Sequence, residues 1–166
     1  TETIGATLGQ QAVNDGVKAA LIGFIVIALF LMVWYRLPGL VATLALMIYV
    51  AITLALYKLI PVTLSTAGIA GFIISIGMAV DANILIFERF KEERRIGRST
   101  RDALDAGFKN AWLSIRDANT ASIIIAVILF WFGSSLIKGF ALTFGLGVIV
   151  SLISAIGITR VFLRAL

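Results

Sequence analysis

The sequence of 166 residues contains no cysteine, no histidine, two prolines and only 14% charged residues. The absence of cysteine excludes disulfides and thiolate nucleophiles, and the absence of histidine excludes the usual zinc sites and a histidine proton relay. The sequence has no G-x-x-x-x-G-K-[ST] segment, which excludes ATP binding through such a loop. On these grounds we expect no metal, no cofactor and no enzymatic activity.

Apolar residues make up 60% of the chain, and the mean hydropathy is +1.05. Soluble proteins average roughly 45–50% apolar and 25% charged residues, so this composition indicates a membrane protein. Five apolar stretches are long enough to cross a bilayer, at about residues 17–35, 39–57, 63–87, 112–132 and 140–162. Short connectors make neighbouring spans antiparallel, and the expected fold is therefore an all-α polytopic transmembrane bundle of five spans.

The net charge of +5 is concentrated in residues 89–111, between the third and fourth spans. If this segment is cytoplasmic, Arg36, Arg160 and Arg164 also fall inside, and only Lys18, Lys58 and Lys138 fall outside. The positive-inside rule then places the N-terminus outside and the C-terminus in the cytoplasm. Charge that is placed in this way indicates contact with a lipid bilayer and no nucleic-acid partner.

The cytoplasmic segment 89–111 has features of a helix. Ser99-Thr-Arg-Asp102 resembles a capping box, with Asp at the position usually held by Glu or Gln. Leu104 and Phe108 follow on one face at i, i+4 spacing, which predicts an amphipathic interfacial helix with Trp112 as its boundary anchor. The alternative is a solvated connector whose charges only set the topology.

Asp81 is the one ionisable residue in the apolar run 69–87. A carboxylate inside a membrane span is unfavourable enough that it usually marks an ion or proton pathway, a polar partner or a water-filled cavity. Asp81 is therefore the leading candidate for a functional residue.

A second acidic residue, Asp117, lies in the polar start of the fourth span. The apolar remainder of that span, residues 123–132, is too short to cross a bilayer alone, so Asp117 is drawn into the membrane. Asp81 precedes Glu88 by seven residues and Asp117 follows Lys109 by eight, so at 1.5 Å per residue both lie roughly 10–12 Å from the charged cytoplasmic segment, a depth at which they are able to face one another. The alternative makes Asp117 a helix N-cap and the ion-pair partner of Arg116.

Small residues recur at every fourth position of the last span: Gly139, Thr143, Gly147, Ser151, Ala155 and Thr159. The third span has a looser version in Gly68, Gly71, Ser75, Ala79 and Ala82. Such stripes allow close approach of helices in lipid, and they predict helix packing through Gly139, Thr143, Gly147 and Ser151.

The run Ile76-Gly-Met-Ala-Val-Asp-Ala-Asn-Ile-Leu-Ile-Phe-Glu-Arg89 resembles the fourth-helix signature of the SecD/SecF family, on its SecD side, in the resistance-nodulation-division superfamily. The resemblance extends over nearly the whole chain, through segments 3–9, 68–71, 117–120 and 137–147. It implies that residues 1–166 are a SecD-type transmembrane domain, one half of a pseudo-symmetric twelve-helix architecture. The first helix, a large extracytoplasmic domain and the SecF half would lie outside this sequence. The odd number of spans, with no basic signal sequence before them, also indicates a part of a longer protein.

This resemblance implies a membrane subunit of the Sec protein-export machinery in a bacterial or archaeal plasma (inner) membrane. Such a subunit would use the proton gradient to assist preprotein translocation on the outer side. Its partners would be the SecF half or subunit, the SecYEG channel and the translocating preprotein. The key Asp of the family maps onto Asp81, Asn83 belongs to the same motif, and Asp117 and Asn119 match the polar start of the fifth helix. These four are the implied proton-relay residues.

Three other functions fit some of these features. An intramembrane aspartyl protease would use Asp81 and Asp117 as a pair, but Gly77-Met-Ala-Val-Asp81 lacks the Gly-x-Gly-Asp spacing of that enzyme class. A proton-coupled small-molecule exporter of the same superfamily would share the acidic residue, but such exporters have much longer chains and match poorly at residues 117–120. A non-conducting scaffold of the translocase would need no proton at Asp81.

Overall fold

The computed structural model describes residues 2–60, 62, 64–155 and 157 of the chain. These residues form five α-helices and no strand: α1 (Glu2–Tyr35), α2 (Leu37–Leu59), α3 (Thr66–Arg95), α4 (Thr100–Phe132) and α5 (Ser135–Ser154). Each helix contains a stretch that is long and apolar enough to cross a membrane. The expected all-α bundle of five spans is confirmed.

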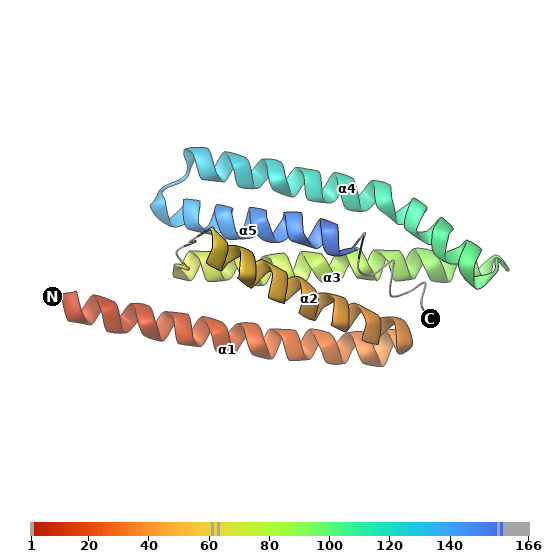
Figure 1. Cartoon of the computed structure of the whole chain (residues 1–166), viewed down its shortest axis with the longest axis horizontal. Helices are drawn as coiled ribbons and strands as arrows, with labels where there is room; N and C mark the ends of the chain where they lie inside the picture. Colours follow the sequence, from red (N-terminus) through yellow and green to blue (C-terminus); the bar gives the residue numbers. More distant parts are fainter. Residues whose placement is uncertain (1, 61, 63, 156, 158–166) are drawn as a thin grey trace.

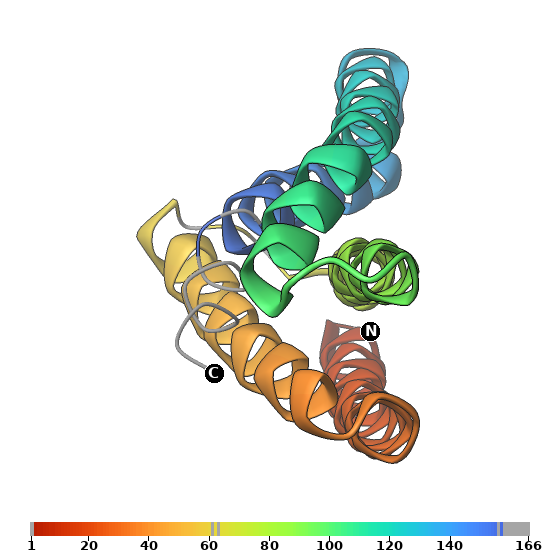
Figure 2. The same ribbon diagram turned by 90° about the vertical axis from the view of Figure 1, so that its right-hand side faces the viewer.

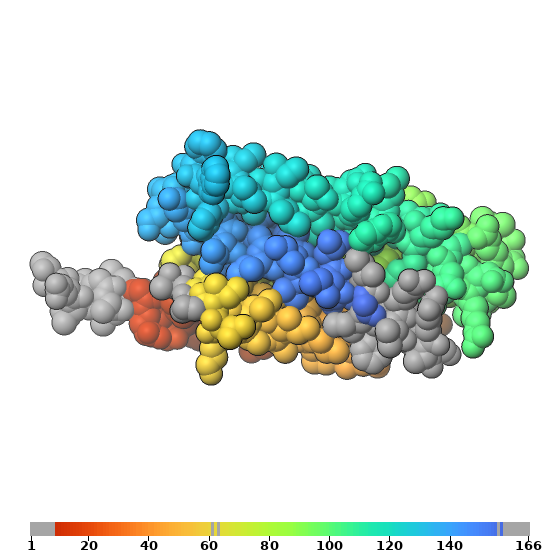
Figure 3. All heavy atoms as spheres, turned by 45° about the horizontal axis from the view of Figure 1, so that its top comes forward, coloured from red at the N-terminus to blue at the C-terminus, as the bar shows by residue number. Residues whose placement is uncertain are grey.

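The central helix of the bundle is α3. It contacts all four other helices, whereas α1 contacts only α2 and α3 among the described residues. Consecutive helices run in opposite directions, so the α1–α2 corner and the α3–α4 turn lie at the same end (Figure 1). Viewed from that end, α1 and α2 lie on one side of α3, and α4 and α5 on the other (Figure 2). Along one face of the molecule, α4, α5 and α2 lie side by side (Figure 3).

The corner between α1 and α2 turns within one residue, Arg36. Its φ of 52° lies in the left-handed region, which is uncommon for residues other than glycine. Pro38 lies in the first turn of α2, where the missing N–H does no harm. A Cβ atom at Gly39 would clash with the main-chain carbonyl of Leu31, so glycine is needed for the close approach of the two helices.

The same end of α1 is fastened to α3 through Tyr35. The Tyr35 hydroxyl donates a hydrogen bond of 2.9 Å to Glu88, and its ring lies 5.4 Å from that of Phe87, centroid to centroid. Lys91 completes the cluster, because its ammonium group lies 3.1 Å from the Glu88 carboxylate and 4.3 Å from the centre of the Tyr35 ring. These contacts hold the α1–α2 corner against the charged end of α3.

α3 and α4 extend together beyond the other helices as a helical hairpin (Figure 1). Its turn contains Gly97 at a φ of 91°, and it ends at the predicted cap, where Ser99 Oγ accepts a hydrogen bond of 3.2 Å from the Asp102 amide. Across the hairpin, Asn110 donates a hydrogen bond of 2.7 Å to the buried Glu93 carboxylate. The basic segment between the spans is therefore an ordered helical hairpin.

The helix expected after Ser99 is present, and it continues without a break into the fourth span, because α4 runs from Thr100 to Phe132. Leu104 is buried, and Gly107 packs so closely on α3 that a Cβ atom there would lie 2.8 Å from the Phe90 nitrogen. Since α3 itself continues to Arg95, the first turns of α4 have a helix to pack against. The position of this segment at the membrane interface stays a prediction, as does the alternative of a solvated connector whose charges only set the topology.

Helix ends also differ from the expected span limits. α1 begins at Glu2, well before residue 17, because its polar first turns continue the helix before the apolar stretch starts. α5 covers Ser135–Ser154, and residue 162, where the expected fifth span ends, lies outside the described residues. Thr159, Arg160 and Arg164 lie outside the described residues.

Small residues line the contact between α3 and α5. A Cβ atom at Gly71 would lie 2.7 Å from the Phe140 carbonyl oxygen, and the Thr143 hydroxyl donates a hydrogen bond of 2.8 Å to the Gly68 carbonyl. On the predicted α5 stripe, Thr143, Gly147 and Ser151 are buried and Gly139 is half-buried. The two stripes thus pack on one another, which allows the helix backbones to approach closely.

Candidate functional site

Asp81 lies on α3 with its side chain exposed on the surface of the five-helix unit. Its neighbours Val80 and Ala82 are buried, so the exposed part of α3 at this level is the side from which Asp81 projects. The part of α3 around Asp81 is apolar. Among the described residues, Asp81 has no partner in a hydrogen bond or an ion pair. The position is therefore open to a polar group from outside this unit.

A small hollow adjoins Asp81 between α3 and α4. Its volume is about 120 Å³, and α3 contributes Met78, Asp81, Ala82 and Leu85, whereas α4 contributes Ser114, Ile115, Ala118 and Asn119. Carboxylate, hydroxyl and amide groups from two helices therefore meet in an otherwise apolar surface. A group of this kind is able to hold a proton or a few waters.

Asn119 connects this hollow to α5. Its side chain is only 4% exposed and donates a hydrogen bond of 2.7 Å to the Ile115 carbonyl. The Ser151 hydroxyl lies 3.4 Å from Asn119 Oδ1 and 2.9 Å from the Val148 carbonyl oxygen. Asn119, which lines the hollow, therefore has a polar contact with α5.

Asn83 does not share this hollow. It is buried at 3% exposure, and two helical residues beyond Asp81 correspond to a rotation of about 200° around α3. Asp81 and Asn83 therefore lie on opposite sides of the same helix. Their proximity in the sequence motif does not place their side chains together.

Asp117 also lies outside the hollow. Its exposed carboxylate forms an ion pair of 2.9 Å with Arg116, as one of the two interpretations predicted. The N-cap part of that interpretation is wrong, because α4 begins at Thr100 and Asp117 lies in its middle. Of the four implied relay residues, the structure brings only Asp81 and Asn119 together.

Two polar residues of this site, Ser114 and Ser151, were not predicted as part of it. One face of α4 carries, within about one and a half turns, Ser114, Ala118 and Asn119. This spacing is visible in the sequence. Ser151 was predicted only as a packing residue. Nothing in the sequence indicates its contact with Asn119, because that contact depends on how α4 and α5 lie together.

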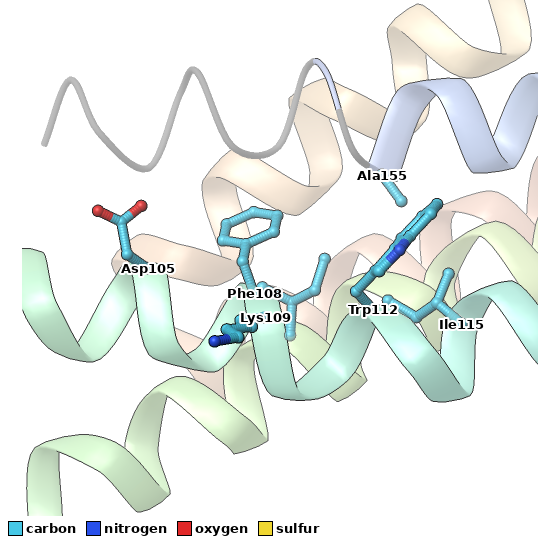
Figure 4. A pocket seen from close by; sticks show the side chains of 7 residues that line it. Asp105, Phe108, Lys109, Trp112, Ile115 and Ala155 are labelled. Atoms are coloured by element: carbon cyan, nitrogen blue, oxygen red, sulfur yellow. The ribbon is translucent and has the colours of Figure 1, made fainter.

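A larger hollow of about 430 Å³ lies nearer the hairpin end of α4. Phe108 and Trp112 point to the same side of α4, with Ala155 beside Trp112 (Figure 4). Ile115 lines both this hollow and the one at Asp81. Asp105 and Lys109 also line this hollow, so it has charged as well as aromatic walls.

The whole chain, residues 1–166, matches the family described as protein export membrane protein SecD/SecF, C-terminal. It is 56% identical to the protein translocase subunit SecD of Thermobaculum terrenum, over 99% of this chain and 33% of that protein. It is 45% identical to the protein translocase subunit SecDF of Bacillus subtilis, over 99% of this chain and 22% of that protein. The crystal structure of SecDF, a translocon-associated membrane protein from Thermus thermophilus, matches with a TM-score of 0.89 and 37% identity, over 95% of this chain and 22% of that one. The chain thus spans a third or less of the length of these relatives.

Proposed function

The chain belongs to the SecD/SecF family of protein-export membrane proteins, and we propose that it is the membrane domain of a protein translocase subunit that uses the proton gradient to assist export. In this proposal, residues 1–166 are one domain of a longer protein in a bacterial or archaeal plasma membrane. A second half of the SecF type, the SecYEG channel and the exported preprotein are its partners.

The exposed position of Asp81 is the observation that carries the proton part of this proposal. A charged carboxylate in the middle of a membrane span is unfavourable by about 2.5–3.5 kcal/mol or more. The described residues provide no cation to offset that cost. A second half of the SecF type, packed over this face, would supply the polar partner and exclude lipid.

Protonation of Asp81 then changes which surroundings its side chain prefers. The neutral acid tolerates apolar contact and donates a hydrogen bond, whereas the carboxylate needs water or a cation. Movement of the opposing half towards or away from Asp81 is thereby tied to proton uptake and release. In this proposal, Asn119 and Ser151 transmit the effect of proton uptake and release from the hollow to α5.

Two alternatives remain for the parent protein. A small-molecule exporter of the same superfamily would use the same carboxylate, but the relatives reported above are translocase subunits by name. A non-conducting scaffold would keep the packing surfaces and make no use of the proton at Asp81. An export assay distinguishes these functions.

We expect a proton gradient to accelerate completion of export several-fold in inverted membrane vesicles that carry the full-length complex and the channel. Precursor protein is arrested part-way, a pH gradient is imposed, and the protease-protected fraction is followed with and without a protonophore. Vesicles that lack the complex should not respond to the gradient. An equal response with and without the complex would remove the proton part of the proposal and favour the scaffold.

The membrane orientation gives a separate prediction. Cysteines introduced at Ser99, in the hairpin turn, and at Ser134, between α4 and α5, should react with membrane-impermeant reagents from opposite sides. In intact cells Ser134→Cys should be labelled and Ser99→Cys protected, and inverted vesicles should reverse the pattern. The chain has no native cysteine to interfere. Labelling of both positions from one side would contradict the proposed orientation.

A further inference from the structure

An apolar hollow of about 530 Å³ lies between α1, α2 and α3, away from Asp81. Its walls include Val17 and Phe24 of α1, Ala51 and Leu54 of α2, and Phe72 of α3. All the residues that line it are apolar. In the end view of Figure 2, α1 lies at the edge of the bundle, next to α2.

The hollow persists because α1 is held against α3 at two separated places. Towards the start of α1, a Cβ atom at Gly16 would lie 2.9 Å from Ile69 Cγ2, so the helices touch there. At the other end, the Tyr35–Glu88 hydrogen bond closes the gap. Between these contacts, Phe24 of α1 and Phe72 of α3 line the intervening space without filling it.

Lys58 lies directly beyond the hollow on α2. It follows Leu54 by four residues and Ala51 by seven, so it continues the lining stripe one turn towards the membrane surface. Its side chain is exposed and forms no ion pair with the described residues. A cation therefore lies above an apolar hollow at the end of the bundle where α2 meets the α2–α3 loop.

We propose that this hollow binds one acyl chain of a phospholipid whose phosphate pairs with Lys58. The apolar walls match an acyl chain, and the unpaired ammonium group matches an anionic headgroup in the adjacent leaflet. A volume of 530 Å³ falls within the roughly 300–1,000 Å³ of small-ligand sites. The unpaired cation at Lys58 favours an anionic lipid as the occupant over an apolar helix from elsewhere in the parent protein. The inference depends on the membrane location of the chain and not on proton use at Asp81.

This site is tested by native mass spectrometry of the full-length complex. The complex is first placed in nanodiscs of phosphatidylcholine that also contain phosphatidylglycerol, and the lipids that remain bound after its release are identified. Wild-type complex should retain phosphatidylglycerol in preference to phosphatidylcholine. Ala51→Phe fills the hollow and should lower retention of both lipids by more than about tenfold. This ratio corresponds to an acyl chain that loses the burial of two methylene groups. Lys58→Gln should lower only the preference for phosphatidylglycerol, by about fivefold, as expected for one basic side chain.

Matched variants control for general effects of bulk and charge. Ile52→Phe adds the same ring one residue along α2, outside the hollow, and Lys138→Gln removes a cation at the same end of the bundle. Both should retain lipid like the wild type. Equal retention by Ala51→Phe and Ile52→Phe, or equal headgroup preference in Lys58→Gln and Lys138→Gln, would overturn the proposal and leave a helix of the parent protein as the occupant.

Discussion

Gly147→Leu should lower the stability of the bundle by about 3 kcal/mol or more, because α3 and α5 would have to separate to admit the side chain. Already a Cβ atom at this position would lie 2.5 Å from Ser75 Cβ and 2.9 Å from the Tyr49 hydroxyl. The same intrusion would break the buried Tyr49–Ser75 hydrogen bond of 2.7 Å. The expected fall in melting temperature is roughly 6–12 °C for a domain of this size. The melting temperature is measured by heating the purified complex in detergent and determining by size-exclusion chromatography how much folded complex remains.

Two variants separate this clash from a general effect of leucine. Gly23→Leu makes the same change in α1, where nothing lies within 4 Å of an added Cβ atom, so it should leave the melting temperature unchanged or slightly higher. Ile149→Leu alters an exposed residue of α5 without adding bulk and should have almost no effect. If the melting temperature of Gly147→Leu equalled those of the two controls, the α3–α5 contact would not be the close packing described above.

Helix number and packing faces were predictable from sequence because both depend on local patterns. Apolar length identifies a span, and a small residue at every fourth position identifies a close-packed face. The ends of the helices were harder to predict. Thr100 and Phe108 belong to the same helix as Phe132 only because α3 continues far enough to support them. That support is a tertiary contact, through Gly107 and the Phe90 backbone, and no local pattern contains it.

The candidate site shows a similar division. Asp81 was predictable because a carboxylate in an apolar helix is unfavourable wherever the helix packs. Its surroundings were not predictable, because depth along two helices does not fix their rotation. Asp117 has a suitable depth, yet it pairs with Arg116 outside the hollow, whereas Asn119, half a turn further along α4, lies beside Asp81. Rotation of α4 about its axis is set by packing on α3 and α5, which involves residues far apart in sequence.

Asp81→Asn should abolish the gradient-dependent part of export while leaving membrane insertion and assembly intact. The amide is nearly isosteric with the carboxyl and still forms hydrogen bonds, but it cannot gain and lose a proton. Because Asp81 is exposed on this unit and no described residue depends on it for a hydrogen bond, its replacement should not disturb the fold. The assay is gradient-driven completion of export into vesicles with the full complex, with subunit amounts compared by immunoblot. Export should fall to the rate that wild-type vesicles show with a protonophore.

Asp117→Asn is the matched control, since it makes the same chemical change at an exposed position of the adjoining helix. It removes the ion pair with Arg116, which as a surface pair contributes about 0–1 kcal/mol, so gradient-driven export should remain close to wild type. Asp81→Glu keeps a titratable group at a longer reach and should retain part of the response. A stable Asp81→Asn complex with wild-type gradient-driven export would refute proton use at this site. The same loss in Asp117→Asn as in Asp81→Asn would instead indicate that both acids, and not the Asp81 hollow alone, serve the proton path.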